Sequence, residues 1–307
     1  MNSSLSKCPD DIFKGLGIAR YAVATAEPVE ASHLSAYREW IAAGNHGSMD
    51  YLARHEALRA DPRLLLPGAR AVISCALPYP SPCHSAGERP CISMYALGSD
   101  YHEIMRQKLL TAAQRLSEAM GGETRVCVDT APILERYWAA KSGLGFIGMN
   151  HHLIIPGLGS CFFLGEILTT LPLRPDSPLE TTCGSCGKCI TSCPGGALGA
   201  DGTFDARRCL SYLTIEHRGP VPPGTNLHGC LYGCDICAAV CPHNQDAEQL
   251  PIDPKLQPRS AVASLTPQRA ATLTQEEFSS LFSHSAVKRT KLAGLQRNAM
   301  ILLSAKK

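Results

Sequence analysis

Cysteine residues are concentrated in one stretch of the chain. Nine of the 15 cysteines lie between residues 183 and 241. Residues 183–194 read CGSCGKCITSCP, which has the spacing C-x2-C-x2-C-x3-C-P. Residues 234–242 read CDICAAVCP, with the shorter spacing C-x2-C-x3-C-P. The first spacing is that of bacterial ferredoxins, in which soft thiolate ligands hold iron–sulfur clusters. The sequence therefore predicts two 4Fe–4S clusters.

The two runs are expected to exchange ligands, because the fourth cysteine of such a run binds the other cluster in two-cluster proteins. The ligands expected for the first cluster are Cys183, Cys186, Cys189 and Cys241. Those expected for the second cluster are Cys193, Cys209, Cys234 and Cys237. Cys209 is the preferred eighth ligand, and Cys230 is the alternative.

Zinc is the other metal to weigh for these cysteines, because paired C-x2-C motifs also form zinc sites. A four-cysteine run that ends in Cys-Pro, followed by a similar run, is more specific for clusters. The six scattered cysteines are expected to be small buried side chains; they are Cys8, Cys75, Cys83, Cys91, Cys127 and Cys161.

Length and composition indicate a globular protein with more than a cluster module. The chain has 307 residues, 45% of them hydrophobic and 18% charged, and a net charge of +2. No apolar run approaches the roughly 20 residues of a membrane span, and the N-terminus lacks the apolar core of a signal peptide. We therefore expect a cytoplasmic protein that does not enter a membrane. The chain after Glu277 has no acidic residue, and this basic tail could contact phosphates; its basic residues are Lys288, Arg289, Lys291, Arg297, Lys306 and Lys307.

Hydrophobic patterns predict strands and helices before the cysteines. We expect helices over 32–43 and 101–120, a buried strand over 71–77, and a Pro-rich loop over 78–90. A strand over 125–129 is expected to end at Asp129, and a helix to begin near Pro132. HLIIP and CFFLGEILTTL, joined by residues 157–159, predict a β-hairpin. The chain is expected to be helical again from about residue 274.

About 175 residues precede the cluster module, whereas a ferredoxin alone would need well under about a hundred. We therefore expect an enzyme domain that receives electrons from the clusters. Neither G-x-G-x-x-G after a strand nor G-x-x-x-x-G-K-[ST] occurs, so the motifs do not indicate a nucleotide cofactor.

Five segments resemble the epoxyqueuosine reductase family, in one order along nearly the whole chain. They read YALGSDYHEIMRQKL (95–109), VDTAPILERYWAAKSGLGFIGMN (128–150), LGEILTTLPL (164–173), CLSYLTIEHRG (209–219) and GCDICAAVCPHN (233–244). The resemblance implies cobalamin, two 4Fe–4S clusters and removal of the epoxide oxygen of epoxyqueuosine in the anticodon wobble nucleotide of tRNA. Many family members also carry a C-terminal helical-repeat module, of which only KRTKLAGLQRNAMILLSAKK (288–307) resembles the first helices.

The resemblance implies an α+β fold. A mixed α/β cobalamin-binding catalytic domain is expected over 1–175, a ferredoxin-like module with both clusters over 176–250, and a short helical segment over 251–307. The implied partners are tRNA carrying epoxyqueuosine and an external one-electron donor, and a monomer is expected.

Asp129 lies in the motif that resembles the family's proton donor. Partial burial at the end of a strand is expected to raise the pKa of this carboxyl and keep it protonated. The hypothesis is that cobalt(I), generated through the clusters, attacks an epoxide carbon while Asp129 protonates the oxygen. The alternative is a purely structural role, in which Asp129 caps the helix that begins near Pro132.

The resemblance also implies cobalamin contacts. The residues expected to make them, besides Asp129, are Tyr95, Gly98, Tyr101, Gly148, Asn150, His152, Ser211 and Thr214. We do not expect His151 or His152 to bind cobalt, because a cobalt without an axial side chain is easier to reduce.

Two other functions remain open from the sequence. One is a cobalamin and iron–sulfur reductase of a small molecule, such as a reductive dehalogenase, although those proteins usually carry an export signal. The other is a non-enzymatic electron carrier with an enlarged ferredoxin fold, which would not bind cobalamin.

Overall fold

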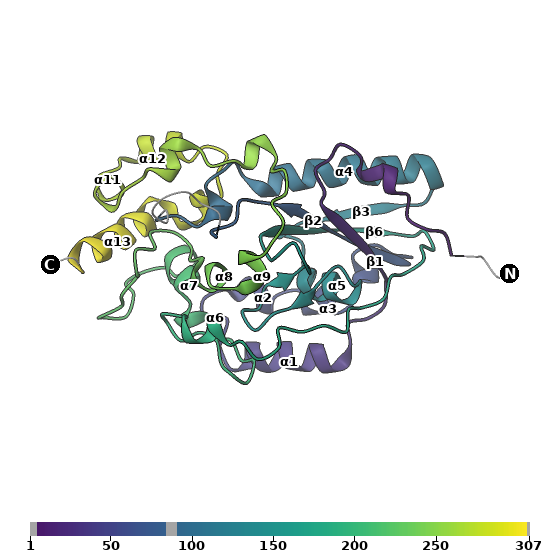
Figure 1. Ribbon diagram of the computed structural model, residues 1–307, viewed down its shortest axis with the longest axis horizontal. Coiled ribbons are helices and arrows are strands. Elements are labelled where there is room, and N and C mark those ends of the chain that lie inside the picture. The colour runs from purple at the N-terminus through teal and green to yellow at the C-terminus, as the bar shows by residue number, and fades with distance from the viewer. Residues whose placement is uncertain (1–4, 84–90, 306–307) are drawn as a thin grey trace.

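The computed structural model describes residues 5–83 and 91–305, which fold around a four-stranded antiparallel sheet (Figure 1). The strand order is β1-β2-β6-β3, so strands distant in sequence lie side by side. Their bounds are Arg20–Thr25 for β1, Ala71–Pro78 for β2, Thr124–Cys127 for β3 and Phe162–Thr169 for β6. Every residue of β2 is buried, because β2 is an inner strand and both of its faces are covered.

Helices cover both faces of this sheet (Figure 1). Helix α4 (Tyr101–Met120) packs an apolar stripe against one face, where it meets Ile73 of β2 and Ile167 of β6. Helix α5 (Glu135–Lys141) covers the opposite face through Trp138, which is 1% exposed. Side chains alternate along a strand, so neighbouring residues of β6 face different helices. This alternation determines which polar groups of β6 lie under α5.

The remaining elements are short. On the α5 side of the sheet lie α1 (Ala31–Ala42), α2 (Asp50–Ala53), α3 (Glu56–Ala60), β4 (Phe146–Ile147) and β5 (Leu153–Ile154). The cysteine-rich part contains α6 (Lys188–Thr191), α7 (Leu210–Ile215), α8 (Ile236–Ala239) and α9 (Pro242–Gln245). The C-terminal part contains α10 (Ser260–Ala263), α11 (Pro267–Ala271), α12 (Gln275–Leu281) and α13 (Lys291–Ser304). Single turns of 3-10 helix are η1 (Asp10–Phe13), η2 (Pro62–Leu64), η3 (Met94–Ala96), η4 (Ala206–Arg208), η5 (Pro254–Leu256) and η6 (Ala286–Thr290).

The longest predicted elements are confirmed. The helix expected over 101–120 is α4, the strand expected over 71–77 is β2, and the helix expected over 32–43 is α1. The C-terminal helical segment is also present, and Thr274 begins α12 with a reciprocal capping box that involves Glu277. The Pro-rich loop expected over 78–90 lies partly outside the described residues. The α+β architecture expected from the sequence is thus confirmed.

The predicted β-hairpin is wrong. β6 pairs with β2 and β3, whereas β5 pairs with the two-residue strand β4. Residues 155–159 do close a tight turn through an isolated bridge between Ile155 and Gly159. The long apolar strand β6 gains more burial as an inner strand between β2 and β3 than it would beside the short β5. Periodicity identified both strands but not their partners.

The predicted boundaries around Asp129 need correction. β3 ends at Cys127, and α5 begins at Glu135 rather than near Pro132. Between them the chain turns, with Asp129 at φ 43°, a left-handed conformation that is uncommon for a residue other than glycine. The residue in the N-cap position of α5 is Leu134, so the capping alternative for Asp129 is wrong.

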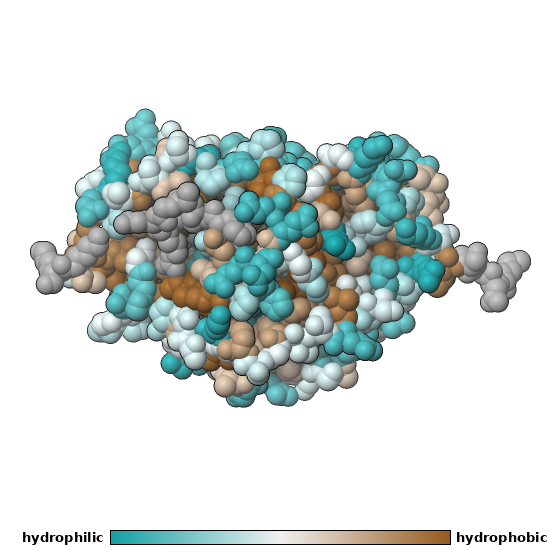
Figure 2. All heavy atoms as spheres, viewed as in Figure 1, coloured by the Kyte–Doolittle hydropathy of each residue, from teal (hydrophilic) through white to brown (hydrophobic). Residues whose placement is uncertain are grey.

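The C-terminal helices share a hydrophobic core with segments far away in the chain. Leu97 after η3, Leu213 of α7 and Tyr232 all pack in the cluster that contains Phe282 and Leu295. This cluster joins parts of all three expected domains, whose boundaries at 175 and 250 therefore remain a prediction. On the face seen in Figure 2, apolar side chains are exposed mainly toward the middle, among hydrophilic ones.

The described part of the chain contains no helix that is long and apolar enough to cross a membrane.

Two neighbouring leucines of α4 test the packing of this helix on the sheet. Leu109 is fully buried, whereas Leu110 is 43% exposed. We expect Leu109→Ala to lower the free energy of unfolding by about 2–5 kcal/mol, because it removes packed methyl groups and leaves a cavity. Leu110→Ala is the matched control and should change it by less than about 0.5 kcal/mol. Chemical denaturation followed by circular dichroism measures both, and equal losses would contradict this packing.

Candidate active site and cluster sites

The Asp129 turn is held by a short hydrogen bond to α5. The backbone N–H of Asp129 donates to Oε1 of Glu135 at 2.6 Å. A left-handed backbone at a non-glycine residue needs such a partner to persist. Because α5 begins at Glu135, the first turn of this helix presents its carboxylate directly to the turn.

The carboxylate of Asp129 contacts the beginning of α4. Its Oδ1 accepts a hydrogen bond from the hydroxyl of Tyr101 at 3.1 Å, and its Oδ2 lies 2.9 Å from Nε2 of His102. The other ring nitrogen of His102, Nδ1, lies 2.6 Å from Oδ1 of Asp100. His102 thus bridges two carboxylates, and the sequence DYH at 100–102 places all three groups on the first turn of one helix.

This first turn is anchored to the sheet. Asp100 is the N-cap of α4 and accepts a hydrogen bond from the backbone N–H of His102 at 3.0 Å. The ring of Tyr101 stacks on Phe163 of β6 with centroids 4.2 Å apart and an angle of 5° between the planes. The partners of Asp129 are therefore fixed before any ligand binds.

The pKa of Asp129 differs from the one that the sequence predicted. Burial alone would raise the pKa of Asp129, but hydrogen bonds and charge from His102, a hydrogen bond from Tyr101 and the charge of Arg289 outweigh it and lower this pKa. Burial also opposes the charge on His102, yet Asp100 and Asp129 raise the pKa of its ring to about 9. At neutral pH the proton therefore resides on His102. The expectation of a protonated Asp129 is wrong for the free protein, because the sequence did not reveal its histidine neighbour.

The C-terminal segment also reaches this site. Arg289 of η6 makes a two-pronged ion pair with Glu216, with Nε–Oε1 at 2.9 Å and Nη2–Oε2 at 2.8 Å. Its guanidinium lies 5.4 Å from the ring centroid of Tyr51 in α2. The sequence predicted only that Arg289 belongs to a basic tail, and its contacts with Glu216 and Tyr51 could not be predicted. His102 was missed as well, and its only signal was its place in the DYH segment.

We infer a concave surface beside Asp129, Arg136 and His152, called the hollow below, because these side chains are at least partly exposed although many protein atoms surround them. The Asp129 side chain is 48% exposed although protein atoms surround most of it. The side chain of Arg136 is exposed and that of His152 is partly exposed, although protein atoms surround both residues. Burial, together with the charge of Arg136 and the neighbouring His151, lowers the pKa of His152 to about 4, so this ring is neutral.

The residues of this hollow fit a large polar ligand. Asn150 is 5% exposed, and its Nδ2 has no hydrogen-bond partner among the described residues. The ring of His151 lies 5.3 Å from that of Phe204 and interacts with the backbone of Gly202 and Thr203. A buried donor without a partner is costly, so it is expected to bond a ligand or water. Arg136 donates to the carbonyl oxygen of His151, which ties this turn to α5.

The other residues predicted to contact cobalamin are placed less favourably. Tyr95 is partly buried and donates to the hydroxyl of Tyr232 at 3.2 Å, while Ser211 keeps partial exposure on α7. Gly98 is buried, and a Cβ there would lie 2.7 Å from the backbone of Leu256. Thr214 is fully buried, with its hydroxyl bonded to the carbonyl oxygen of Leu210 at 2.7 Å. Gly98 and Thr214 are thus buried by other parts of this chain, and their contact with cobalamin remains a prediction.

Four of the cysteines predicted for the first cluster lie within electrostatic reach of one another. The neighbouring thiols Cys183 and Cys186 act on both Cys189 and Cys241, whose pKa values are raised first by burial and then by these neighbours. Cys183 accepts a hydrogen bond to its Sγ from the backbone N–H of Met149 at 3.4 Å. A Cβ at Gly148 would lie 3.2 Å from this sulfur. This group of cysteines therefore adjoins the 148–152 turn.

The other four cysteines form a second group. Burial raises the pKa of Cys237, and the neighbouring thiols that raise it further are Cys234, Cys209 and Cys193. The pKa of Cys209 is raised in the same way by burial and by Cys234 and Cys193. Cys230 is 2% exposed, and its Sγ lies 3.9 Å from the carbonyl oxygen of His228.

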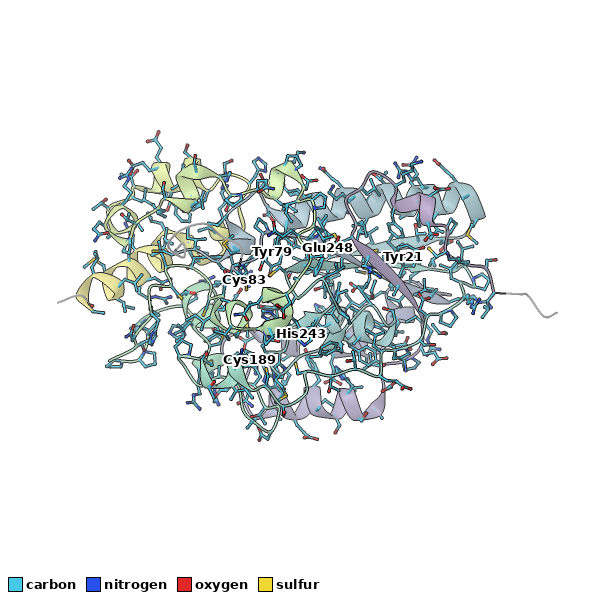
Figure 3. All side chains as sticks on the ribbon, in the orientation of Figure 1. Tyr21, Tyr79, Cys83, Cys189, His243 and Glu248 are labelled. Carbon is cyan, nitrogen blue, oxygen red and sulfur yellow. The ribbon has the colours of Figure 1, made fainter. Side chains whose placement is uncertain are left out.

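The glycines of the first run let the chain curve around its cysteines. Gly184 and Gly187 have φ values of 64° and 58°. Over residues 5–83 and 91–305, no three His, Cys, Asp or Glu side chains are placed to hold a single metal ion. Thiolates on a 4Fe–4S cluster each bind a different iron and need not converge on one point. Figure 3 labels Cys189, on α6, and His243, on α9 after the second run.

A separate cavity of about 420 Å³ lies between Tyr79 and Glu248, both labelled in Figure 3. It is mostly apolar, and its described lining contains none of the residues predicted for the clusters or cobalamin. The residues predicted to bind cofactors or to deliver protons therefore lie outside this cavity.

Known proteins share these features. Residues 59–130 match the family model described as epoxyqueuosine reductase QueG, DUF1730, and residues 182–244 match a 4Fe-4S double cluster binding domain. The epoxyqueuosine reductase of Gloeobacter violaceus is 38% identical over 95% of this chain and 93% of its own length. That of Aliivibrio fischeri is 44% identical over 71% of this chain, but the match covers only 61% of that relative.

Solved structures agree with the sequence relatives. A crystal structure of epoxyqueuosine reductase with a modified tRNA stem loop superimposes with a TM-score of 0.87 at 31% identity, covering 96% of this chain and 79% of that one. The Bacillus subtilis structure with its catalytic aspartate loop swung out of the active site has a TM-score of 0.84 at 29% identity, with the same coverage.

The fold and the two cysteine groups define an iron–sulfur oxidoreductase with an acid–histidine pair at its open site. The chain belongs to the epoxyqueuosine reductase family, as the sequence resemblance implied. The matched double cluster domain supports two 4Fe–4S clusters as cofactors, and the relatives support an epoxyqueuosine reductase over a small-molecule reductase.

The contact between His102 and Asp129 has a measurable consequence. We expect Asp129→Asn to lower the pKa of His102, because it removes one of the two carboxylates that raise this pKa to about 9. In the wild-type protein the raised pKa of His102 contributes stability that is lost as pH rises through about 9, whereas the lowered pKa of Asp129 contributes stability that is lost as pH falls through that pKa. NMR titration of the His102 ring measures the shift. Asp11→Asn, an exposed change in η1, is the control, and an unchanged His102 pKa in Asp129→Asn would contradict the contact.

Proposed function

We propose that this protein reduces epoxyqueuosine to queuosine in tRNA and that Asp129 delivers a proton to the epoxide oxygen. The single observation that carries the proposal is the pairing of Asp129 with a charged His102 at an open site beside the first cysteine group. The family supports the overall reaction. The geometry supports the assignment of roles.

The reaction needs both electrons and protons. Removing an epoxide oxygen breaks two C–O bonds, forms one C=C bond and releases water, which consumes two electrons and two protons. The clusters relay single electrons from an external donor, and cobalamin supplies the electron-rich centre that opens the epoxide ring. The residues of this chain must bind the substrate and deliver the protons.

The first proton is held on Nε2 of His102, 2.9 Å from Oδ2 of Asp129. As negative charge develops on the epoxide oxygen, the Asp129 carboxylate takes the proton of His102 and passes it to this oxygen, which leaves His102 neutral. The hydroxyl of Tyr101, 3.1 Å from Oδ1, keeps the carboxyl group oriented during this exchange. Asp100 stabilises the charge of His102 from the other side. The half-exposed position of Asp129 lets a bulky nucleotide reach it.

The hollow beside Asp129 is proposed to hold cobalamin. Asn150, His151 and His152 of the 148–152 turn would face it, and Arg136 holds this turn in place. The neutral ring of His152 and the partnerless Nδ2 of Asn150 suit the amide groups at the edge of a corrin. Tyr101 and Ser211 remain proposed contacts at the rim.

Cluster ligands are proposed on the crossed pattern. Cys183, Cys186 and Cys189 would share the first cluster with Cys241, which the mutual influence of these thiols supports. The second cluster would use Cys193, Cys209, Cys234 and Cys237. The first cluster would adjoin the 148–152 turn through Cys183 and thus be the one that reduces the cofactor.

The proposed substrate is tRNA carrying epoxyqueuosine. A family member has been solved with an epoxyqueuosine-modified tRNA stem loop. In this chain Lys288 and Lys291 are exposed on either side of Arg289, which places positive charge at the edge of the Asp129 site. These lysines would contact phosphates. We also propose a monomer that works in the cytoplasm, where tRNA is found, and an external one-electron donor.

Activity measurements test the role of Asp129. We expect Asp129→Asn to lower the rate of queuosine formation by about 10²-fold or more, because an amide cannot deliver the proton. The reconstituted enzyme is mixed with modified tRNA and a reductant, and nucleosides are quantified by mass spectrometry. Cluster and cobalamin spectra should remain unchanged, as in the control Asp11→Asn. Full turnover by Asp129→Asn with intact cofactors would refute the acid role.

Iron analysis distinguishes the two possible eighth ligands. We expect Cys209→Ser to lose the second cluster and retain roughly half of the iron, since Cys209 lies among the second group of thiols. Cys230→Ser should retain both clusters. Iron content and electron paramagnetic resonance of the reduced proteins provide the measurement. The opposite pattern would assign Cys230 as the ligand.

A further inference from the structure

A buried carboxyl group lies under α5 that the proposed mechanism does not use. Glu166 of β6 is 0% exposed, and neither of its carboxyl oxygens has a hydrogen-bond partner in the described part of the chain. Its neighbours Leu164 and Leu168 belong to the clusters on the α5 face of the sheet, so the alternation of the strand directs Glu166 to that face. An acidic side chain in such a place is rare unless it has a function.

Two more buried polar groups lie on the same face. Ser74 of β2 is directly opposite Glu166 in the strand register and is 0% exposed. Trp138, on the buried side of α5, is 1% exposed. Among the described residues, neither Oγ of Ser74 nor Nε1 of Trp138 has a hydrogen-bond partner. Ordered water commonly bonds such groups in proteins. Glu166, Ser74 and Trp138 are therefore buried polar groups on the α5 face of the sheet, and we call their surroundings the chamber.

Glu135 connects this chamber to the active site. Its Oε1 accepts a hydrogen bond from the backbone N–H of Asp129 at 2.6 Å, and its side chain is partly exposed. Glu135 and Trp138 are three residues apart on α5 and thus share one side of the helix. Glu135 acts electrostatically on Glu166 as well as on Asp129. Three carboxyl groups thus run from the interior of the sheet to the substrate site.

Like charges this close cannot all be ionised in a buried place. Burial, followed by the charge of Glu135, raises the pKa of Glu166 well above its usual range. Burial, followed by the charge of Asp129, raises the pKa of Glu135 to about 7. Glu166 in turn raises the pKa values of Cys75 of β2 and Cys127 of β3, whereas His102 of α4 and Arg136 of α5 act on Glu135. Of these, His102 and Arg136 favour an ionised Glu135 and do not neutralise Glu166.

We propose that Glu166 and Glu135 form a proton store that delivers the second proton of the reaction to Asp129. This inference rests on the proposed function, in which two protons are consumed while His102 holds only one. Glu135 gives its proton to the Asp129 carboxylate after that group has protonated the epoxide oxygen. Glu166 then passes its own proton to Glu135 through water in the chamber. Only protons move in these steps, and solvent in the hollow refills the store after product leaves.

The proposal is tested with the reconstituted holoenzyme and epoxyqueuosine-modified tRNA under single turnover. Glu166→Gln preserves size and polarity but carries no transferable proton. We expect it to slow product formation by about tenfold or more at about pH 8, above the pKa of Glu135. Imidazole buffer should restore most of the rate, because a small acid can enter the open hollow and replace the store. The exposed Glu123→Gln is the matched control and should react at the wild-type rate, with or without imidazole.

Infrared spectroscopy provides a readout that does not depend on activity. At about pH 8, above the pKa of Glu135, the wild-type protein should show the carbonyl band of a protonated carboxylic acid, and Glu166→Gln should lose most of this band. Absence of the band in wild type would overturn the proposal. Wild-type turnover by Glu166→Gln would overturn it too, and so would a slow Glu166→Gln that imidazole does not restore, because that result indicates a structural role.

A second variant keeps the proposal testable if Glu166→Gln does not fold. If Glu166→Gln lacks the cluster spectrum or the unfolding transition of the wild type, Glu135→Gln takes its place, since Glu135 is partly exposed. It should show the same loss of rate and the same recovery with imidazole, and unimpaired turnover would overturn the proposal. The acid role of Asp129 is judged separately. Full turnover by Asp129→Asn refutes the proposed function, whereas an inactive Asp129→Asn beside a fully active Glu166→Gln refutes the proton store alone.

Discussion

The contact between His102 and Asp129 is the interaction on which the active site depends. It joins the first turn of α4 to a left-handed turn after β3, and it decides where the proton resides. Burial alone raises the pKa of the Asp129 carboxyl, and His102 provides the largest opposing effect. With His102, the carboxyl is ionised and its proton is stored one hydrogen bond away. The acid is thus better described as a pair than as a single residue.

Helix α5 organises the surroundings of this pair. Glu135 at its start holds the backbone of Asp129, and Arg136 holds the 148–152 turn through the carbonyl oxygen of His151. The same turn contacts the sulfur of Cys183 through the backbone of Met149. One short helix therefore connects the proton donor, the proposed cofactor hollow and the first cysteine group. A displacement of α5 would disturb proton delivery and electron delivery together.

The C-terminal segment completes the site from the other side. Arg289 pairs with Glu216, lies over Tyr51 and acts on Asp129 through its charge. The helices that carry it share a core with η3 and α7, so this basic group is fixed by packing rather than free in solvent. Positive charge held near the acid lowers its pKa and faces the side from which a polyanion would approach.

The sequence alone determined what depends on residue type and local spacing. The cysteine runs indicated two clusters, apolar periodicity located α4 and β2, and resemblance marked Asp129 and the family. These features are local, because a few neighbouring residues specify them. Tertiary structure decided the strand order, which placed β6 beside β2 instead of β5. It also brought His102 and Arg289 to Asp129 from two separate elements, which lowered the pKa of the acid where the sequence predicted a raised one. Such contacts depend on how distant segments pack, and the pKa of a buried group depends on those contacts rather than on its own position in the chain.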